Sequence, residues 1–136
     1  MQYMLDTNIL VYVLNARPQH QAVLDRFNQH DARHLCLSSI TLAELRFGVA
    51  QSTQHDATQR KLDRIVATLN VAPFEDRAAR SYGVLRAQLQ AAGTPIGPLD
   101  TLIAAHAQSL GLTLVTNNLR EFSRVSNLRV EDWIAD

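Results

Sequence analysis

The sequence predicts an α/β domain in which a central parallel sheet is flanked by helices. Short apolar runs bounded by polar residues alternate along the chain with longer stretches of helical character. This alternation is typical of parallel sheets, because each crossover between parallel strands needs a helix that covers one face. With 136 residues the chain has the length of one domain, residues 1–136, and can bury a core without disulfides or a structural metal.

The predicted strands are short and mostly apolar, as expected of strands buried within a sheet. They are Tyr3–Leu5, Leu35–Leu37, Val71–Ala72, Leu112–Val115 and Leu128–Val130. In open parallel sheets, ligands bind outside the carboxyl ends of the strands. The residues that directly follow these segments are therefore the first candidates for a functional site.

The predicted helices are the longer segments between the strands, and several carry clear end signals. Gly93-Thr94-Pro95 ends one helix, Pro98 suits the first turn of the next, and Gly111 is a candidate C-cap. The helices span Thr7–Asn15, Pro18–Gln29, Ile40–Ala50, Asp56–Leu69, Glu75–Ala92 and Pro98–Leu110. The apolar stripe of Asp56–Leu69 could face the core or another protein.

Composition excludes several classes of protein. Thirteen basic residues balance thirteen acidic ones, which argues against a nonspecific nucleic-acid coat but leaves room for a local basic groove. Only Lys61 among the basic residues is not arginine, a pattern that fits phosphate binding as well as genomic codon bias. Cys36 has no cysteine partner, which favours a reducing, cytoplasmic location. No run approaches the roughly 20 apolar residues that cross a bilayer.

Acidic residues follow the predicted strands or begin the predicted helices at three places. Asp6 ends the first strand, Glu44 lies in the helix after the second strand, and Asp100 lies in the first turn opened by Pro98. Each also has a purely structural interpretation. Asp6 could cap a helix, Glu44 could form a capping box with Thr41, and Asp100 could simply complement the helix dipole.

Taken together, these carboxylates indicate a metal site. Parallel strands would bring them to one edge of the sheet, where mutual repulsion would raise their pKa values unless a cation relieved it. Mg²⁺ and Mn²⁺ prefer such oxygen ligands, and no Cys/His cluster offers a zinc site. His106 is interpreted as a core histidine. The chemistry that suits an all-oxygen site is metal-assisted phosphodiester hydrolysis. No Walker-type or GxGxxG loop is present, so no nucleotide cofactor is expected.

Four sequence blocks resemble those of PIN-domain ribonucleases, and in particular VapC toxins of type II toxin–antitoxin systems. The blocks occur in the family's order across essentially the whole chain. They begin at Met4-Leu5-Asp6-Thr7-Asn8, Ser38-Ser39-Ile40-Thr41-Leu42-Ala43-Glu44, Gly97-Pro98-Leu99-Asp100-Thr101 and Val115-Thr116-Asn117-Asn118. The resemblance implies a three-layer PIN-like domain.

The resemblance also implies roles for individual residues. Asp6, Glu44 and Asp100 would be the catalytic acids that hold Mg²⁺ or Mn²⁺. Supporting positions would be occupied by Thr7, Asn8, Thr116 and Asn118. Many PIN domains carry a fourth acid where this chain has Asn118, with Glu121 three residues further on. The substitution puts occupancy of a second metal site in doubt.

Substrate and partners follow from the same resemblance. The ending Glu131-Asp132-Trp133 is similar to that of toxins that cut initiator tRNA near the anticodon. The family implies a homodimer and a VapB-type antitoxin whose C-terminal segment blocks the active site. The expected protein is therefore a cytoplasmic endoribonuclease with an RNA substrate, and it has no membrane partner.

Other interpretations of the acidic residues stay open at this point. The absence of the fourth acid would also fit a degenerate PIN domain that binds RNA or a partner without cleavage. A haloacid-dehalogenase-like phosphatase would use a strand-end Asp, but it needs a second Asp where this chain has Asn8. A phosphoaspartate receiver would need a suitably placed lysine, and Lys61 is the sole candidate.

Overall fold

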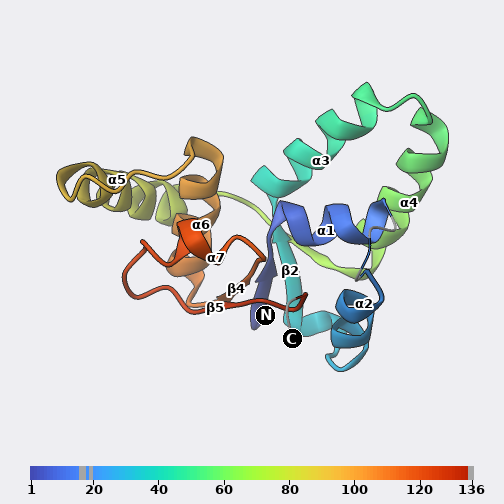
Figure 1. Cartoon of the computed structure of the whole chain (residues 1–136), viewed down its shortest axis with the longest axis horizontal. Helices are drawn as coiled ribbons and strands as arrows, with labels where there is room; N and C mark the ends of the chain where they lie inside the picture. Colours follow the sequence, from blue (N-terminus) through green and yellow to red (C-terminus); the bar gives the residue numbers. More distant parts are fainter. Residues whose placement is uncertain (16–17, 19, 135–136) are drawn as a thin grey trace.

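The computed structural model describes residues 1–15, 18 and 20–134. Within these residues the chain forms a five-stranded parallel sheet with helices on both faces, which confirms the predicted three-layer α/β fold (Figure 1). The strand order is β3-β2-β1-β4-β5. The strands are β1 (Tyr3–Leu5), β2 (Leu35–Ser38), β3 (Asn70–Ala72), β4 (Thr113–Val115) and β5 (Val130–Glu131).

The long helices lie close to their predicted positions. They are α1 (Thr7–Leu14), α2 (His20–Asn28), α3 (Ser39–Gln51), α4 (His55–Thr68), α5 (Asp76–Ala91) and α6 (Pro98–Leu110). Gln19, which the sequence places in the second helix, lies outside the described residues. The short helix α7 (Leu119–Phe122) and a 3₁₀ turn at Ala32–His34 were not predicted.

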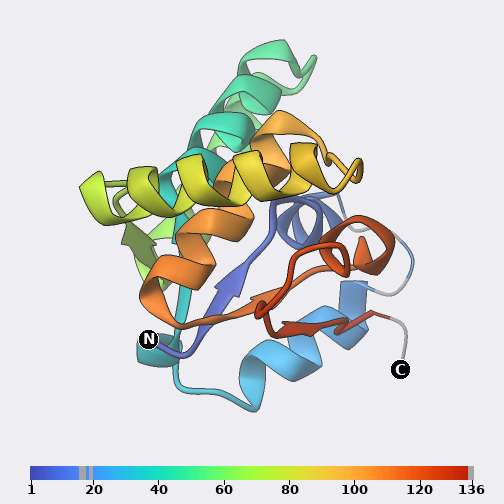
Figure 2. The same ribbon diagram turned by 90° about the vertical axis from the view of Figure 1, so that its left-hand side faces the viewer.

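Side chains of the central strands alternate between the faces of the sheet, and this alternation builds a separate apolar cluster on each face. Met4 and Leu114 pack with helices α5, α6 and α7, whereas Leu5 and Val115 pack with helices α1 to α4. The helices of the two layers flank the sheet in Figures 1 and 2. The carboxyl ends of the central strands therefore open between the two layers.

Several residues singled out in the sequence belong to these cores. Leu62 of α4 is fully buried and Ile65 packs beside it, so the apolar stripe of this helix faces the core. His106 is buried, its Nδ1 lies 2.8 Å from Ser38 Oγ, and its ring meets Phe74 edge-on. Burial lowers the pKa of His106. It is a core histidine, as predicted.

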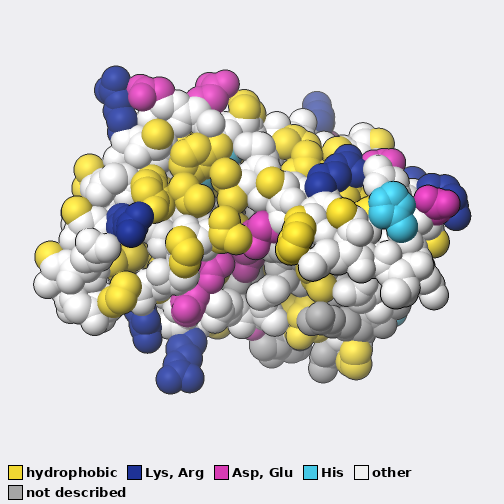
Figure 3. Space-filling view, turned by 90° about the horizontal axis from the view of Figure 1, so that it is seen from above, with side chains coloured by type: hydrophobic (Ala, Val, Ile, Leu, Met, Phe, Trp, Pro, Cys, Tyr) yellow, Lys and Arg dark blue, Asp and Glu magenta, His cyan; other side chains and the backbone are white. Residues whose placement is uncertain are grey.

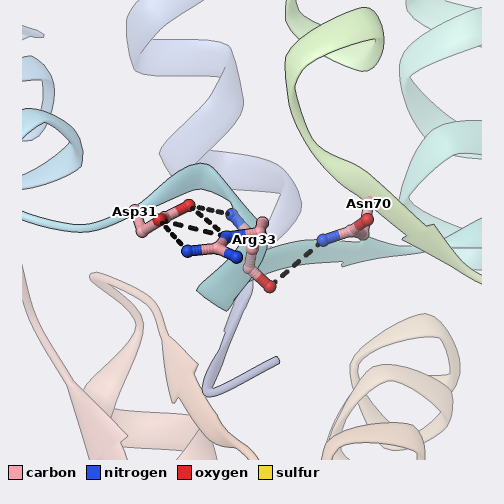
Figure 4. A network of polar contacts seen from close by, with 3 residues as sticks. All are labelled: Asp31, Arg33 and Asn70. Atoms are coloured by element: carbon pink, nitrogen blue, oxygen red, sulfur yellow. Dashed lines mark hydrogen bonds and ion pairs between the residues drawn. The ribbon is translucent and has the colours of Figure 1, made fainter.

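A polar network joins the beginnings of β2 and β3 (Figure 4). The Asp31 carboxylate accepts hydrogen bonds from the backbone N–H and the guanidinium of Arg33. These contacts lower the pKa of Asp31 to about 2. The side-chain amide of Asn70 donates to the Arg33 carbonyl at 3.3 Å. Among the described residues, no helix is long and apolar enough to cross a membrane.

Candidate active site

The predicted site residues lie just beyond the carboxyl ends of β1, β2 and β4 or at the start of α6. Asp6 directly follows β1, and its backbone N–H donates to the Val115 carbonyl of β4 at 2.9 Å. Glu44 lies in α3, one and a half turns after β2 ends. Asp100 occupies the first turn of α6. Each acid is therefore positioned by an element that begins at this edge of the sheet.

Asp6 is held by hydrogen bonds to both of its oxygens. The Thr7 backbone N–H donates to Oδ1 at 2.7 Å, and the Thr116 hydroxyl donates to Oδ2 at 2.8 Å. Thr116 Oγ1 in turn accepts from the Asn118 backbone N–H. Asp6 is only 2% exposed, and this burial raises the pKa of its carboxyl, although both hydrogen bonds oppose the rise. Asp6 is thus the N-cap of α1, and both of its carboxyl oxygens accept hydrogen bonds from the protein.

Thr7 connects Asp6 to Glu44. Its backbone binds Asp6, while its hydroxyl donates to Glu44 Oε1 at 2.7 Å and lies 3.3 Å from Thr41 Oγ1. The capping-box interpretation of Thr41 and Glu44 is wrong, because Ser38 caps α3 by accepting from the Ile40 N–H. Glu44 instead points to the start of α1. The negative charge of Glu44 adds to the rise in the Asp6 pKa.

Asp100 faces the other acids from the opposite layer. Burial, a hydrogen bond with Glu121 and the charges of Asp6, Glu121 and Glu44 together raise the pKa of Asp100 to about 8. Glu121 also accepts from the side-chain amide of Asn118 at 3.3 Å. Three carboxyl groups, those of Asp6 before α1, Glu44 in α3 and Glu121 in α7, therefore lie close enough at this edge of the sheet to raise the pKa of Asp100 in α6. Figure 3 shows a row of acidic side chains on one face of the molecule.

Glu121 is the residue that sequence reasoning did not include among the site residues. It occupies α7, which follows Thr116-Asn117-Asn118 and is too short to show helical periodicity. Asn118, the predicted position of the missing fourth acid, is the N-cap of α7 and contacts Glu121. The only signal for Glu121 in the sequence was its position three residues after Asn118. Asn8 is exposed on the first turn of α1, and its supporting role stays a prediction.

The donor chemistry of this site fits a divalent cation. Among the described residues, these four carboxyl groups have no Lys or Arg ion-pair partner. The described side chains also contain no group of three Asp, Glu, His or Cys residues already arranged around an ion position. The acids are therefore near one another without forming a closed ligand shell, as expected of carboxylates that repel each other. A cation with oxygen preference would relieve this repulsion.

An α/β fold with acidic side chains gathered at the carboxyl ends of its parallel strands is the architecture of the PIN domain. The family model described as "PIN domain" matches residues 3–128 of this chain. A Salmonella typhimurium protein named tRNA(fMet)-specific endonuclease VapC is 41% identical over 133 residues, which cover 98% of each chain. Ribonuclease VapC2 of Haemophilus influenzae is 43% identical over 134 residues, 98% of this chain and 99% of that one.

Solved structures agree with these sequence relatives. DNA-bound VapBC from Salmonella typhimurium superposes with a TM-score of 0.91 at 41% identity, covering 98% of both chains. VapBC2 from Rickettsia felis, bound to a DNA fragment from its promoter, gives a TM-score of 0.89 at 41% identity and covers 98% of this chain and 99% of that one. This chain belongs to the VapC family of PIN-domain proteins.

Proposed function

We propose that this protein is a metal-dependent endoribonuclease that acts as the toxin of a VapBC-type toxin–antitoxin module. The observation that carries the proposal is the set of mutually repelling carboxyl groups, without basic partners in the described structure, at the carboxyl edge of a PIN-domain sheet. A relative of nearly equal length is named tRNA(fMet)-specific endonuclease, which supports initiator tRNA as the substrate, cut near the anticodon.

The proposed catalytic acids are Asp6, Glu44 and Asp100, which would hold Mg²⁺ or Mn²⁺, and Glu121 joins them as a fourth acid. When bound, the ion lowers the pKa of an attacking water and offsets charge on the phosphate. Thr7 and Thr116 fix the orientation of Asp6 and Glu44 through the hydrogen bonds described above. Thr7 occupies one oxygen of Glu44 and leaves the other to accept a proton from water.

The proposed partners follow from the relatives. The superposed structures are complexes of VapC with VapB, some on DNA, which supports a VapB-type antitoxin for this chain as well. We also propose that the protein is a homodimer and acts in the cytoplasm, where its RNA substrate is found. The alternative of a degenerate domain that binds RNA without cleavage rested on the missing fourth acid. Glu121 places a carboxyl group beside Asp100 and so weakens that alternative.

Cleavage of an initiator-tRNA transcript by the purified protein tests this proposal. We expect cleavage with Mg²⁺ or Mn²⁺ and none in EDTA. Asp6→Asn should lower kcat/KM by more than about 100-fold, because even the partners of metal ligands contribute 10- to 100-fold. Asp56→Asn, an equal change on the exposed face of α4, serves as the matched control and should cut like the wild type.

Two results would reject the assignment. Cleavage that survives EDTA would rule out the metal-dependent mechanism, and full activity of Asp6→Asn would remove Asp6 from it. Expression in growing cells adds a separate readout, since the wild type and Asp56→Asn should arrest growth and Asp6→Asn should not. RNA binding without cleavage at saturating Mn²⁺ would support the degenerate domain instead.

A further inference from the structure

Arginine side chains in the described structure differ in whether a carboxylate faces them. Those with a carboxylate partner within 4 Å are Arg26, Arg33, Arg46 and Arg80. The described arginines without such a partner are Arg60, Arg64, Arg77, Arg86, Arg120, Arg124 and Arg129, and three of these, Arg86, Arg120 and Arg124, belong to elements that adjoin Asp100 or Glu121. Arg86 Nη1 donates to the Tyr82 hydroxyl and Arg124 Nη1 donates to the Pro95 carbonyl, each at 2.9 Å. These neutral acceptors orient the guanidinium groups and leave their charges uncompensated.

Arg86 and Arg124 lie around the turn that leads into Asp100. Arg86 of α5 lines a cavity of about 200 Å³ together with Pro95, Pro98 and Thr101. Thr101 directly follows Asp100, and a Cβ at Gly97 would lie 3.7 Å from Asp100 Oδ2. Arg124 binds the carbonyl of Pro95 in this turn, so Arg86 and Arg124 both adjoin one residue.

Arg120 lies on the α7 side of the site. It directly precedes Glu121, whose carboxyl group lies near enough to raise the pKa of Asp100, and its own side chain is exposed. Figure 3 shows Lys and Arg side chains beside one end of the row of acidic side chains. The residues that line the cavity beside Arg86 include no acid. One margin of an acidic site is therefore positively charged.

An RNA substrate needs such a margin, because its phosphates are repelled by the acids that must act on one of them. The chain has a formal net charge of zero, so general attraction cannot supply the binding. Guanidinium groups bind phosphate oxygens in a bidentate manner. We propose that Arg86, Arg120 and Arg124, the arginine patch, bind the phosphate backbone of the RNA substrate beside the acidic site. This inference rests on the proposed ribonuclease function.

The salt dependence of RNA binding tests the role of the arginine patch directly. A fluorescently labelled initiator-tRNA transcript is titrated by anisotropy in EDTA, where no cleavage is expected, between about 50 and 200 mM NaCl. Each phosphate contact that is lost should reduce the slope of log K against log salt by about 0.7 to 0.9. The Arg86→Gln, Arg120→Gln, Arg124→Gln triple variant should therefore lose about 2 from this slope. Each single variant should weaken binding roughly fivefold.

Matched variants separate charge from structure. Arg80→Gln removes an arginine from the same helix as Arg86, but one that is paired with Asp76, and should leave the slope unchanged. The triple Lys variant keeps the charges and should keep the slope. Arg120→Gln removes an exposed side chain for which the described structure shows no hydrogen bond or ion pair, so it gives a decisive result even if the triple variant does not fold.

The outcomes distinguish this inference from the proposed function. If the wild type cuts the transcript but the Gln variants bind with its slope and affinity, the arginine patch is not the phosphate site and the ribonuclease assignment stands. If the wild type neither binds nor cuts the transcript, the role of the arginine patch and the ribonuclease assignment are both overturned. A reduced slope in the Gln variants, with unchanged thermal unfolding and an unchanged Arg80→Gln slope, supports the patch.

Discussion

The two helical layers hold their acidic residues in different ways. On the side of α1 to α4, Asp6 and Glu44 accept hydrogen bonds from neutral donors, namely the backbone and hydroxyl of Thr7 and the hydroxyl of Thr116. On the side of α5 to α7, Glu121 accepts from the side-chain amide of Asn118, and its carboxyl group raises the pKa of Asp100, for which the described residues show no such donor. The first pair has its orientation set by the protein itself. In the second pair, the nearby carboxyl group of Glu121 raises the pKa of Asp100.

This difference indicates a division of roles. Asp6 and Glu44 form a prearranged half of the site, because hydrogen-bond donors of the protein fix the orientation of both carboxyl groups. Asp100 must lose its proton before it can bind a cation, since only the ionised carboxyl group is a ligand. The raised pKa of Asp100, about 8, thus favours its protonated form at neutral pH in the metal-free protein. The predictions below perturb each side in turn.

Thr116→Val tests the prearranged side and should have the largest effect. The change keeps the shape of the side chain but removes the donor to Asp6 Oδ2 and the acceptor of the Asn118 N–H. We expect kcat/KM to fall about 10- to 100-fold, the usual cost of losing a hydrogen bond to a metal ligand. Thr113→Val in β4, the strand that ends just before Thr116, is the control, because the Thr113 hydroxyl contacts Arg129 instead of Asp6. Equal activities of the two variants would contradict the prediction.

The pH profile of cleavage tests the protonated side. Since the pKa of Asp100 is raised to about 8, its ligand form is scarce below that pH and becomes more abundant as pH rises. At limiting Mg²⁺ the cleavage rate should rise about tenfold per pH unit between about pH 6 and 8. Higher Mg²⁺ should move this rise to lower pH, because the ion competes with the proton. A cleavage rate that does not change with pH above pH 5 at limiting Mg²⁺ would contradict a raised pKa of Asp100.

Stability of the metal-free protein should show the opposite trend. A carboxyl group whose folded pKa lies above its unfolded value of 3.8 binds more protons in the folded state, so its contribution lowers stability as pH rises from about 4 to 8. Asp100→Asn removes this penalty and should stabilise the protein by about 1 kcal/mol at pH 8, because water screens the half-buried site. Thermal unfolding of the wild type and Asp100→Asn in EDTA at pH 5 and pH 8 measures this stabilisation. Asp56→Asn keeps Asp100 and should be as stable as the wild type at both pH values.

Asn118→Asp should have the smallest effect. It tests the contribution of the Asn118 amide that donates to Glu121. The new carboxylate would replace an amide donor to Glu121 Oε2 with a like charge. At limiting Mg²⁺ we expect about a threefold lower rate, the scale of a partly exposed charge pair. Saturating Mn²⁺ should restore the rate, because the added oxygen can serve as a ligand. A loss that persists at saturating Mn²⁺ would mean that Asn118 acts through its amide.

Local signals predicted most of the fold. Strand β1 and helix α6 begin and end at the predicted residues, because polar residues bound the first and Pro98 and Gly111 delimit the second. Strand β5 was predicted at Leu128–Val130 but forms at Val130–Glu131, where the register with Leu114 and Val115 places it. Helix α7 has four residues, too few for a periodic pattern.

The site could be predicted where an acid follows a strand and could not where it depends on packing. Asp6, Glu44 and Asp100 were identified because strand ends and helix starts meet at one edge of the sheet. The approach of Glu121 to Asp100 depends on the direction of α7, which no local pattern reveals. The binding of Glu44 by Thr7 joins residues 37 positions apart, so a local capping motif was misleading.

The hydrogen bond between Thr116 and Asp6 spans 110 residues of chain, and the first strand made becomes the middle of the finished sheet. At a translation rate of roughly 5–20 residues per second, Thr116 is therefore synthesised about 5–20 s after Asp6. A nascent chain on the ribosome cannot assemble the complete site until β4 and α7 have emerged. The order of the strands thus leaves the candidate site incomplete until nearly the whole chain has been synthesised.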